Sequence, residues 1–181
     1  MAERSSASAQ REARAAGMRI GLIGDLAVGT DGGGSHAWSR QRDMLIDLRI
    51  GAPPDLLNVK GQDWGLMAFS PLALRRNGYR AFIELLRASL QHVGGIRLDH
   101  IFSLQRLWLI ASGVAADQGA YLRYPIIDLL RLIALESWRH RAIVIGEDLG
   151  TMPQGFQQHI ADAGMLGMRV MWFQKEHGLF T

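Results

Sequence analysis

Short apolar runs rich in β-branched residues alternate with stretches of helical periodicity along this 181-residue chain. The runs cover residues 18–28, 95–99, 142–147 and 168–173, and the first is longer than the strand we expect within it. Between them, apolar residues recur at helical spacing over 79–91 and 125–139. Strands and helices in alternation predict an α/β fold with a parallel sheet and right-handed crossovers.

Other segments carry weaker signals. Thr151 and Gln154 have the spacing of a capping box, which predicts a third helix ending near Ala163, before Gly164. The segment 35–74 interrupts the alternation of strands and helices, and we expect it to be a long loop. A loop of that length in a compact domain is usually functional. The first 19 residues superficially resemble a transit peptide, but their two glutamates favour an exposed amphipathic helix.

Composition excludes several classes of protein. The chain is 48% hydrophobic and 20% charged, which is typical of a globular protein, and it has no apolar run long enough to span a membrane. Its net charge is only +3 and its arginines are scattered, so we expect no nucleic-acid partner. The absence of cysteine excludes disulfides and thiolate metal sites and fits a reducing, cytoplasmic location.

Two carboxylates stand where apolar runs end. Asp99 lies at the end of the apolar run in Gly-Ile-Arg-Leu-Asp-His, and Glu147 lies at the end of the run Val-Ile-Gly-Glu. The carboxyl ends of parallel strands meet at one rim, where active sites collect. Two acids at one rim are what cleavage of a glycosidic bond requires. Arg97 lies two residues before Asp99 and so shares its face, where its charge would keep Asp99 ionised.

The neighbouring residues leave alternatives open. Asp148 follows Glu147, so only one of the two can face Asp99, and both could instead cap the next turn. Asp25 is either a further acid of the rim or a cap for the glycine-rich turn 29–35. That turn lacks the lysine of a phosphate-binding loop, so we interpret it as a flexible turn. His100 directly follows Asp99, whereas the other five histidines are interpreted as surface or cap residues.

A tryptophan in the long segment has two interpretations. Trp64 lies in Gly-Gln-Asp-Trp-Gly, with Gln62 beside it and Asp55 a few residues earlier. A flat aromatic ring can stack on a sugar while amide and carboxylate groups bind its hydroxyls, but a lone loop tryptophan can equally be a hydrophobic plug. The other four tryptophans are interpreted as core or helix-face residues.

Five stretches together resemble the 4-α-glucanotransferases, or amylomaltases, of glycoside hydrolase family 77. They are GLIGDLAVGTDGGGSHAW, GAPPDLLNVKGQDWGL, GYRAFIELLRASLQHVGGIRLDHIFSLQRLW, GAYLRYPIIDLL and VIGEDLGTMP. The resemblance implies a (β/α)₈ barrel that transfers α-1,4-glucan segments to the 4-hydroxyl of an acceptor glucan with retention, without metal or organic cofactor.

The resemblance also implies residue roles. Asp99 matches the nucleophile and Glu147 the general acid/base. Arg97 and His100 match residues that bind the nucleophile and the sugar beside it. Three further residues match the family's mobile loop over the acceptor side: Asp55, Gln62 and Trp64. The partners implied are maltooligosaccharides and other α-1,4-glucans.

Two departures from the family pattern matter. No aspartate of a His-Asp motif follows Glu147, although the family has a third catalytic acid there. About four strand–helix units cannot close an eight-stranded barrel of about 250 residues. We therefore expect residues 1–181 to be the central part of a single (β/α)₈ catalytic domain, truncated at both ends and with little activity alone.

Three rival hypotheses remain. The first is a remnant that binds glucans without turnover, and the second is a hydrolase of the same superfamily. The third is a phosphate-binding α/β enzyme built on the glycine-rich turn, which the missing lysine already disfavours.

Overall fold

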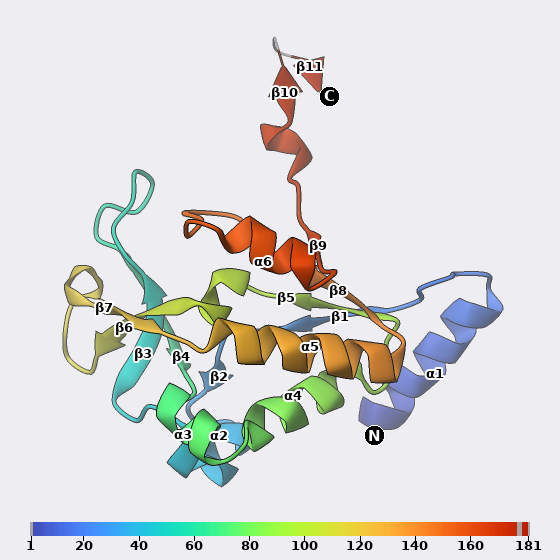
Figure 1. The fold of residues 1–181 in the computed structure, drawn as a ribbon, viewed down its shortest axis with the longest axis horizontal. Coiled ribbons are helices and arrows are strands. Elements are labelled where there is room, and N and C mark those ends of the chain that lie inside the picture. Colours follow the sequence, from blue (N-terminus) through green and yellow to red (C-terminus); the bar gives the residue numbers. More distant parts are fainter. Residues whose placement is uncertain (1, 177–178, 181) are drawn as a thin grey trace.

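A parallel sheet forms the centre of the computed structural model, which describes residues 2–176 and 179–180. Its strands lie in the order β1-β5-β8-β9 (Figure 1). Their bounds are Ile23–Leu26 for β1, Gly95–Leu98 for β5, Ile143–Gly146 for β8 and Leu166–Gly167 for β9. Each strand pairs with the next in parallel, so their carboxyl ends share one edge.

A helix precedes each strand after the first. These helices are α4 (Arg80–Leu90), α5 (Ile126–His140) and α6 (Phe156–Asp162). Figure 1 shows α5 running alongside the parallel sheet, and α4 packs beside α5. This alternation confirms the predicted α/β class, and three of the four strands, β1, β5 and β8, lie within the predicted apolar runs.

The core lies between the sheet and these helices. Apolar residues repeat every four positions on α4, with Phe82, Leu86 and Leu90 buried. They pack against Ile96 of β5 and Ile133 of α5, both 1% exposed. A strand that is covered on both faces of the sheet needs apolar side chains on both faces. Such strands therefore appear in the sequence as short continuous apolar runs.

A second, antiparallel sheet arises from two excursions of the chain. Its strands lie in the order β2-β4-β3-β6-β7. Their bounds are Thr30–Asp31 for β2, Leu48–Ala52 for β3, Gln62–Met67 for β4, Arg106–Ala111 for β6 and Ala120–Arg123 for β7. The excursions leave from the carboxyl ends of β1 and β5, and the sheet has its own small core around Ile50 and Leu109.

The segment 35–74 is therefore not the long loop that we expected from its prolines and glycines. It contains α2 (Ser35–Ser39), a 3₁₀ turn η1 (Gln41–Asp43), the β3–β4 hairpin and α3 (Pro71–Arg76). A register shift between Ile50 and Gly51 interrupts the hairpin, which weakens the alternating pattern by which strands are recognised.

Element boundaries correct two further expectations. The helix expected from Thr151 begins only at Phe156, after Gly155 in the left-handed conformation, so the capping-box prediction was wrong. Its end is confirmed, because Gly164 has φ +66°. The strand expected over 168–173 is also wrong: β9 is shorter and earlier, and a 3₁₀ turn η4 occupies Met171–Phe173.

The remaining elements lie outside the two sheets. Helix α1 (Ala2–Ala15) is exposed, as predicted, and Figure 1 places it at the far end from the antiparallel sheet. Two more 3₁₀ turns, η2 and η3, span Ile101–Leu104 and Ala116–Gln118. Strands β10 (Lys175–Glu176) and β11 (Leu179–Phe180) pair at the C-terminal end.

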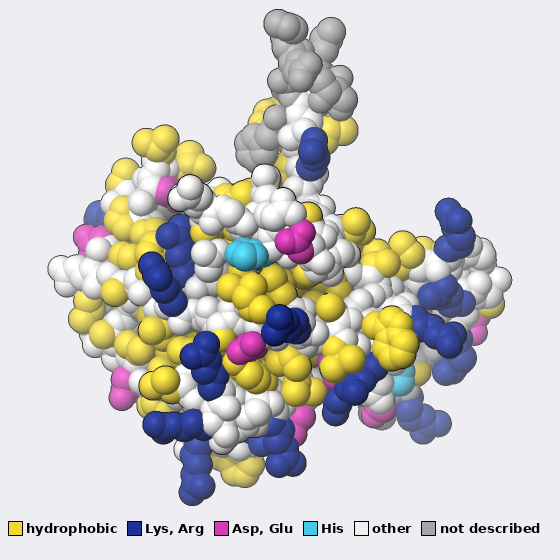
Figure 2. All heavy atoms as spheres, viewed as in Figure 1, with side chains coloured by type: hydrophobic (Ala, Val, Ile, Leu, Met, Phe, Trp, Pro, Cys, Tyr) yellow, Lys and Arg dark blue, Asp and Glu magenta, His cyan; other side chains and the backbone are white. Residues whose placement is uncertain are grey.

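The surface carries several large apolar side chains, visible among the basic residues in Figure 2. Trp38, Trp138 and Trp172 are 76%, 78% and 69% exposed, so none of them is a core residue. Trp38 on α2 and Trp138 on α5 do lie on helix faces, which was the other half of their interpretation. The outer side of α5 is likewise exposed at Ile127 and Leu135, although we expected burial on more than one side. No helix in the described part of the chain has the length and apolarity needed to cross a membrane.

Candidate active site

Asp99 and Glu147 follow neighbouring parallel strands at the same edge of the sheet. Leu98 of β5 is paired with Gly146 of β8, so the two acids take the next matched position. The Asp99 nitrogen donates to the Leu26 carbonyl and the Glu147 nitrogen donates to the Leu98 carbonyl, each at 2.9 Å. Both ladders therefore continue one residue beyond the strands, and matched residues point to the same side of a parallel sheet.

Backbone groups hold the Glu147 carboxylate in place. Its Oε2 atom accepts a hydrogen bond from the His100 nitrogen at 2.9 Å, and its Oε1 atom accepts one from the Leu149 nitrogen at 3.0 Å. The Glu147 carbonyl accepts from the Ile101 nitrogen at 2.9 Å. Glu147 is only 9% exposed, so these partners meet the need of a buried carboxylate for hydrogen bonds.

Gly146 permits this close arrangement. A Cβ atom at position 146 would lie 2.2 Å from the Cδ1 atom of Ile101, the buried first residue of η2. Only a residue without a side chain lets Ile101 fold back over the end of β8 while Glu147 reaches His100. The glycine in Val-Ile-Gly-Glu is thus part of the construction of the site.

Arg97 joins two carboxylates at the rim. Its Nη1 atom is 2.7 Å from Asp25 Oδ1, and its Nη2 atom is 2.8 Å from Asp99 Oδ1. The hydrogen bonds to Asp25 and then to Asp99 raise the Arg97 pKa, against the effect of burial. Arg97 and Asp99 do lie on one face, as the strand alternation predicted.

Asp25 belongs to this rim and does not cap the glycine-rich turn. Of the two interpretations left open, the structure selects the ion pair with Arg97. The turn is capped by Asp31, whose Oδ1 atom accepts from the Gly33 nitrogen at 2.7 Å.

His100 connects the rim to the aromatic residues around it. Its backbone has φ +44°, an uncommon value for a residue with a side chain, and it is the residue before η2. The imidazole meets the Trp64 ring edge-on at 5.3 Å and the Phe102 ring at 5.6 Å, and Phe102 meets Phe156 at 5.1 Å. Burial lowers the His100 pKa, so the ring is neutral at pH 7.

Asp148 points to a different partner from Glu147. Its Oδ1 atom accepts from the Met168 nitrogen at 2.9 Å, beyond β9. Only one of the two adjacent acids therefore faces the end of β5, as predicted, and Asp148 fixes the next segment of the chain.

The three residues expected on the acceptor side border a cleft of about 240 Å³. Trp64 and Gln62 lie on β4, where the Trp64 Nε1 atom donates to Gln62 Oε1 at 3.2 Å. Asp55 lies at the base of the hairpin tip and accepts from the Leu57 and Asn58 nitrogens at 2.7 and 2.6 Å. Trp64 packs on the small second core, as the hydrophobic-plug interpretation predicts, and it also lines the cleft.

The tip of the β3–β4 hairpin exposes apolar side chains. Leu56, Leu57 and Val59 are 100%, 93% and 76% exposed. Figure 1 shows this tip standing away from the body of the molecule.

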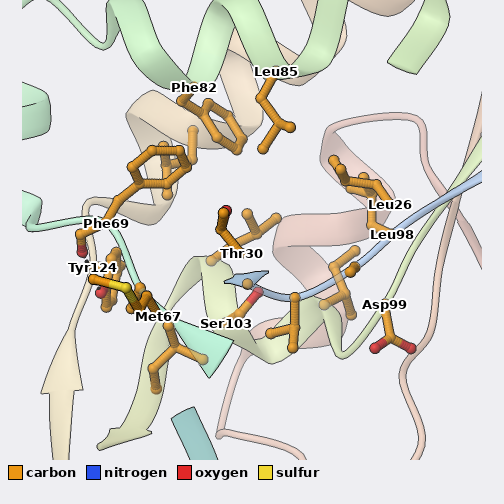
Figure 3. Close-up of a pocket in the computed structure, with 18 of the residues that line it drawn as sticks. Leu26, Thr30, Met67, Phe69, Phe82, Leu85, Leu98, Asp99, Ser103 and Tyr124 are labelled. Carbon is orange, nitrogen blue, oxygen red and sulfur yellow. Dashed lines mark hydrogen bonds between the residues drawn. The ribbon is translucent and has the colours of Figure 1, made fainter. Parts of the chain in front are cut away.

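A second cavity lies beneath the first strand ends. Its volume is about 70 Å³ and apolar side chains such as Leu26, Phe82 and Leu98 line most of it. In Figure 3 the Asp99 carboxylate lies at the edge of this cavity and points away from its apolar side chains. Most of its lining belongs to the two hydrophobic cores, so this space is a packing gap between core side chains.

The sequence reading missed part of the cleft wall. Arg106 and Trp108 on β6, Tyr121 on β7 and Leu149 beyond β8 line it together with His100 and Trp64. The only sequence signal for this wall was the alternation of polar and apolar residues in Arg-Leu-Trp-Leu. Neither β6 nor β7 was expected as a strand.

The described residues contain no group of three or more metal-binding side chains that could hold an ion. Of the histidines interpreted as surface or cap residues, His36 packs edge-on against Phe69 at 5.6 Å and His140 is hydrogen-bonded to the Glu136 carbonyl. His177 lies outside the described residues.

Comparison with known proteins places this geometry in a family. The model of glycoside hydrolase family 77, described as 4-α-glucanotransferase, matches residues 1–180. The 4-α-glucanotransferase of Mycobacterium tuberculosis is 41% identical over 170 residues, which are 94% of this chain and 24% of that protein. The 4-α-glucanotransferase of Haemophilus influenzae is 36% identical over 180 residues, 99% of this chain and 26% of that protein.

Comparison with solved structures finds amylomaltases as well. The crystal structure of amylomaltase from Corynebacterium glutamicum matches with a TM-score of 0.93 and 38% identity, over 99% of this chain and 25% of that one. Amylomaltase from Streptococcus agalactiae, solved in complex with acarbose, shares the fold with a TM-score of 0.76 at 21% identity, over 84% of this chain and 32% of that one. The chain spans about a quarter of the length of its relatives. It belongs to the 4-α-glucanotransferase family, glycoside hydrolase family 77.

Proposed function

We propose that this chain supplies the nucleophile and the general acid/base of a 4-α-glucanotransferase that works with retention. The observation that carries the proposal is the pairing of Asp99 and Glu147 at the matched ends of β5 and β8. In this proposal residues 1–181 are the central part of one (β/α)₈ catalytic domain, and the substrates are α-1,4-glucans.

The chemistry has two steps. A carboxylate oxygen of Asp99 attacks the anomeric carbon of a glucosyl unit, the bond to the departing 4-oxygen breaks, and Glu147 gives that oxygen its proton. The 4-hydroxyl of an acceptor glucan then gives its proton to Glu147 and attacks the same carbon, which releases Asp99. Retention requires the two carboxyl groups to lie about 5–5.5 Å apart.

The surrounding residues suit this division of work. Asp99 must be ionised to attack, and Arg97 lies 2.8 Å from it. Glu147 must deliver and recover a proton at a fixed point, and two backbone nitrogens fix it. Neutral His100 and Trp64 form the wall from which an acceptor would approach, and a wall that excludes water favours transfer over hydrolysis.

A chimera tests the proposal most directly. Residues of this chain replace the 170 matched residues in the Mycobacterium tuberculosis 4-α-glucanotransferase, and the product is incubated with maltotriose. We expect longer maltodextrins and glucose from the chimera. The Asp99→Asn and Glu147→Gln chimeras should lose activity by about 10²–10⁴-fold or more. A folded chimera that makes no product, or whose activity survives both substitutions, would refute the proposal.

The isolated 181-residue chain should form little or no product from maltotriose, because a family catalytic acid and half of the barrel are not among its residues. Robust product from the isolated chain would overturn that expectation. Release of glucose that does not depend on added acceptor would favour the rival hydrolase. Binding of maltooligosaccharide that Asp99→Asn leaves unchanged, with an inactive chimera, would favour the non-catalytic remnant.

A further inference from the structure

Part of the cleft wall has a composition that the proposed catalytic residues do not explain. It is formed by Arg106 and Trp108 of β6 and by Tyr121 of β7. Trp108 and Tyr121 are cross-strand partners, and Arg106 lies two residues before Trp108, so all three side chains share one face of the antiparallel sheet.

The three side chains form one ordered cluster. The Trp108 and Tyr121 rings meet edge-on at 5.1 Å, and the Arg106 guanidinium carbon lies 4.3 Å from the centre of the Tyr121 ring. The Trp108 Nε1 atom donates to the Ala116 carbonyl at 2.9 Å, which fixes the indole. A Cβ atom at Gly119 would lie 2.6 Å from the indole, so this glycine leaves the room that Trp108 occupies.

The polar groups of Arg106 and Tyr121 have no hydrogen-bond partner among the described residues. Arg106 makes no ion pair or hydrogen bond with any residue of the described part of the chain, and its guanidinium group is held only over the Tyr121 ring. Tyr121 is 44% exposed, and its hydroxyl has no hydrogen-bond partner among the described residues either. Five N–H donors and a phenol beside two aromatic rings are therefore available to a ligand.

We infer that Arg106, Trp108 and Tyr121 form a binding subsite for a glucosyl unit of the acceptor glucan, remote from the bond that is made. The inference rests on the proposed function and extends it to residues with no role in the two catalytic steps. The apolar face of a pyranose ring packs on aromatic side chains, while its hydroxyls accept hydrogen bonds from a guanidinium group. The cleft runs without interruption from this wall to His100 and Leu149, whose nitrogens bind Glu147.

Charge favours a neutral sugar over an anion. The carboxylate of Asp55 borders the same cleft as the guanidinium group of Arg106. A phosphate ion bound by Arg106 would be repelled by Asp55, whereas a neutral ligand rich in hydroxyl groups can bind donors and acceptors together.

The test is calorimetric titration of the 181-residue chain with maltose and with maltohexaose. Arg106→Leu and Tyr121→Leu should each weaken maltohexaose binding by roughly fivefold or more, the loss expected for one charge-assisted hydrogen bond or one ring contact. Maltose, which we expect to bind at Trp64 and His100, should change by less than about twofold. Arg131→Leu is the matched control, since Arg131 is an exposed arginine on α5 away from the cleft, and it should change neither constant.

Two milder variants keep the test valid if a leucine variant does not fold. Arg106→Lys keeps the charge but loses the planar fork, and Tyr121→Phe keeps the ring but loses the hydroxyl. Each should weaken maltohexaose binding by about two- to threefold while the circular dichroism spectrum stays unchanged.

The outcomes separate this inference from the proposed function. If maltohexaose binds but every wall variant binds it as tightly as the parent chain, the subsite is refuted while the catalytic proposal stands. If inorganic phosphate displaces the sugar and binds only when Arg106 is present, the wall is an anion site and the inference is wrong. If the parent chain binds no maltooligosaccharide, the inference fails as well. Loss of binding in the wall variants together with an inactive chimera would support the subsite and refute the catalytic proposal.

Discussion

The Glu147 carboxylate accepts a hydrogen bond from the backbone nitrogen of His100, 2.9 Å away, across the ends of two neighbouring parallel strands. His100 is the residue after Asp99, so one bond ties the proposed acid/base to the strand that carries the proposed nucleophile. The relative position of the two acids is therefore set by backbone groups and not by flexible side chains. Proton transfer and nucleophilic attack both need such fixed geometry.

Substitution of Glu147 should affect stability according to what remains to accept these bonds. Glu147→Ala leaves the partly buried nitrogens of His100 and Leu149 without a protein acceptor, at a combined cost of about 1–3 kcal/mol. Glu147→Gln retains an amide oxygen and should lose less than half as much. Urea denaturation followed by circular dichroism measures the difference, and equal losses in the two variants would contradict the anchoring role.

Trp64→Ala should raise the His100 pKa. Burial lowers the pKa of His100 in the folded protein, and the Trp64 ring 5.3 Å away provides part of that burial. Removing the indole admits water and lets the imidazole accept a proton at higher pH. An NMR titration of the imidazole signals, with His100→Gln to assign them, measures the shift. Trp138→Ala, a change at an exposed tryptophan on α5, should leave the His100 pKa unchanged.

Glu136 should make the protein sensitive to acid. This α5 residue is 1% exposed and bonds Arg87 of α4 at 2.9 Å and Arg139 at 2.8 Å. The hydrogen bond from Arg87 is the main cause that holds the Glu136 pKa below its ordinary value of 4.5, and Arg139 adds to it. A carboxyl group whose pKa is lower when folded adds stability above its unfolded pKa, and that stability is lost as the pH falls through the folded value.

Glu136→Gln should accordingly flatten the acid side of the stability profile. At pH 7 we expect it to cost about 1–3 kcal/mol, since one buried group loses its charged partners. Below pH 4 the difference from the parent chain should shrink. Thermal melts between pH 3 and pH 7 measure this, and a difference that does not depend on pH would show that the ion pairs contribute nothing. Asp162→Asn, at an exposed acid of α6, is the control.

The sequence predicted the parts of the fold whose signals are local. Strands β5 and β8 were recognisable because Ile96, Leu98 and Val144 are buried and so form short apolar runs. The acids at their ends followed from the geometry of parallel sheets. The antiparallel sheet was missed because its strands are joined by long-range pairing, such as β3 with β6, which leaves no mark on either segment alone. The wall formed by Arg106 and Tyr121 was missed for the same reason.

Gly146→Ala should be destabilising, and a second substitution should relieve it. The added methyl group would lie 2.2 Å from Ile101 Cδ1, the far end of a fully buried side chain, so Ile101 has to shift within a packed core. Overpacking of this kind costs about 1–3 kcal/mol. Ile101→Val alone removes that methyl group and should cost about 0.5–1.5 kcal/mol. In the double variant the two groups no longer collide, so its loss should be smaller than the sum of the single losses. A double-mutant cycle in urea measures the coupling, and strict additivity would mean that Gly146 is not required for the packing of Ile101.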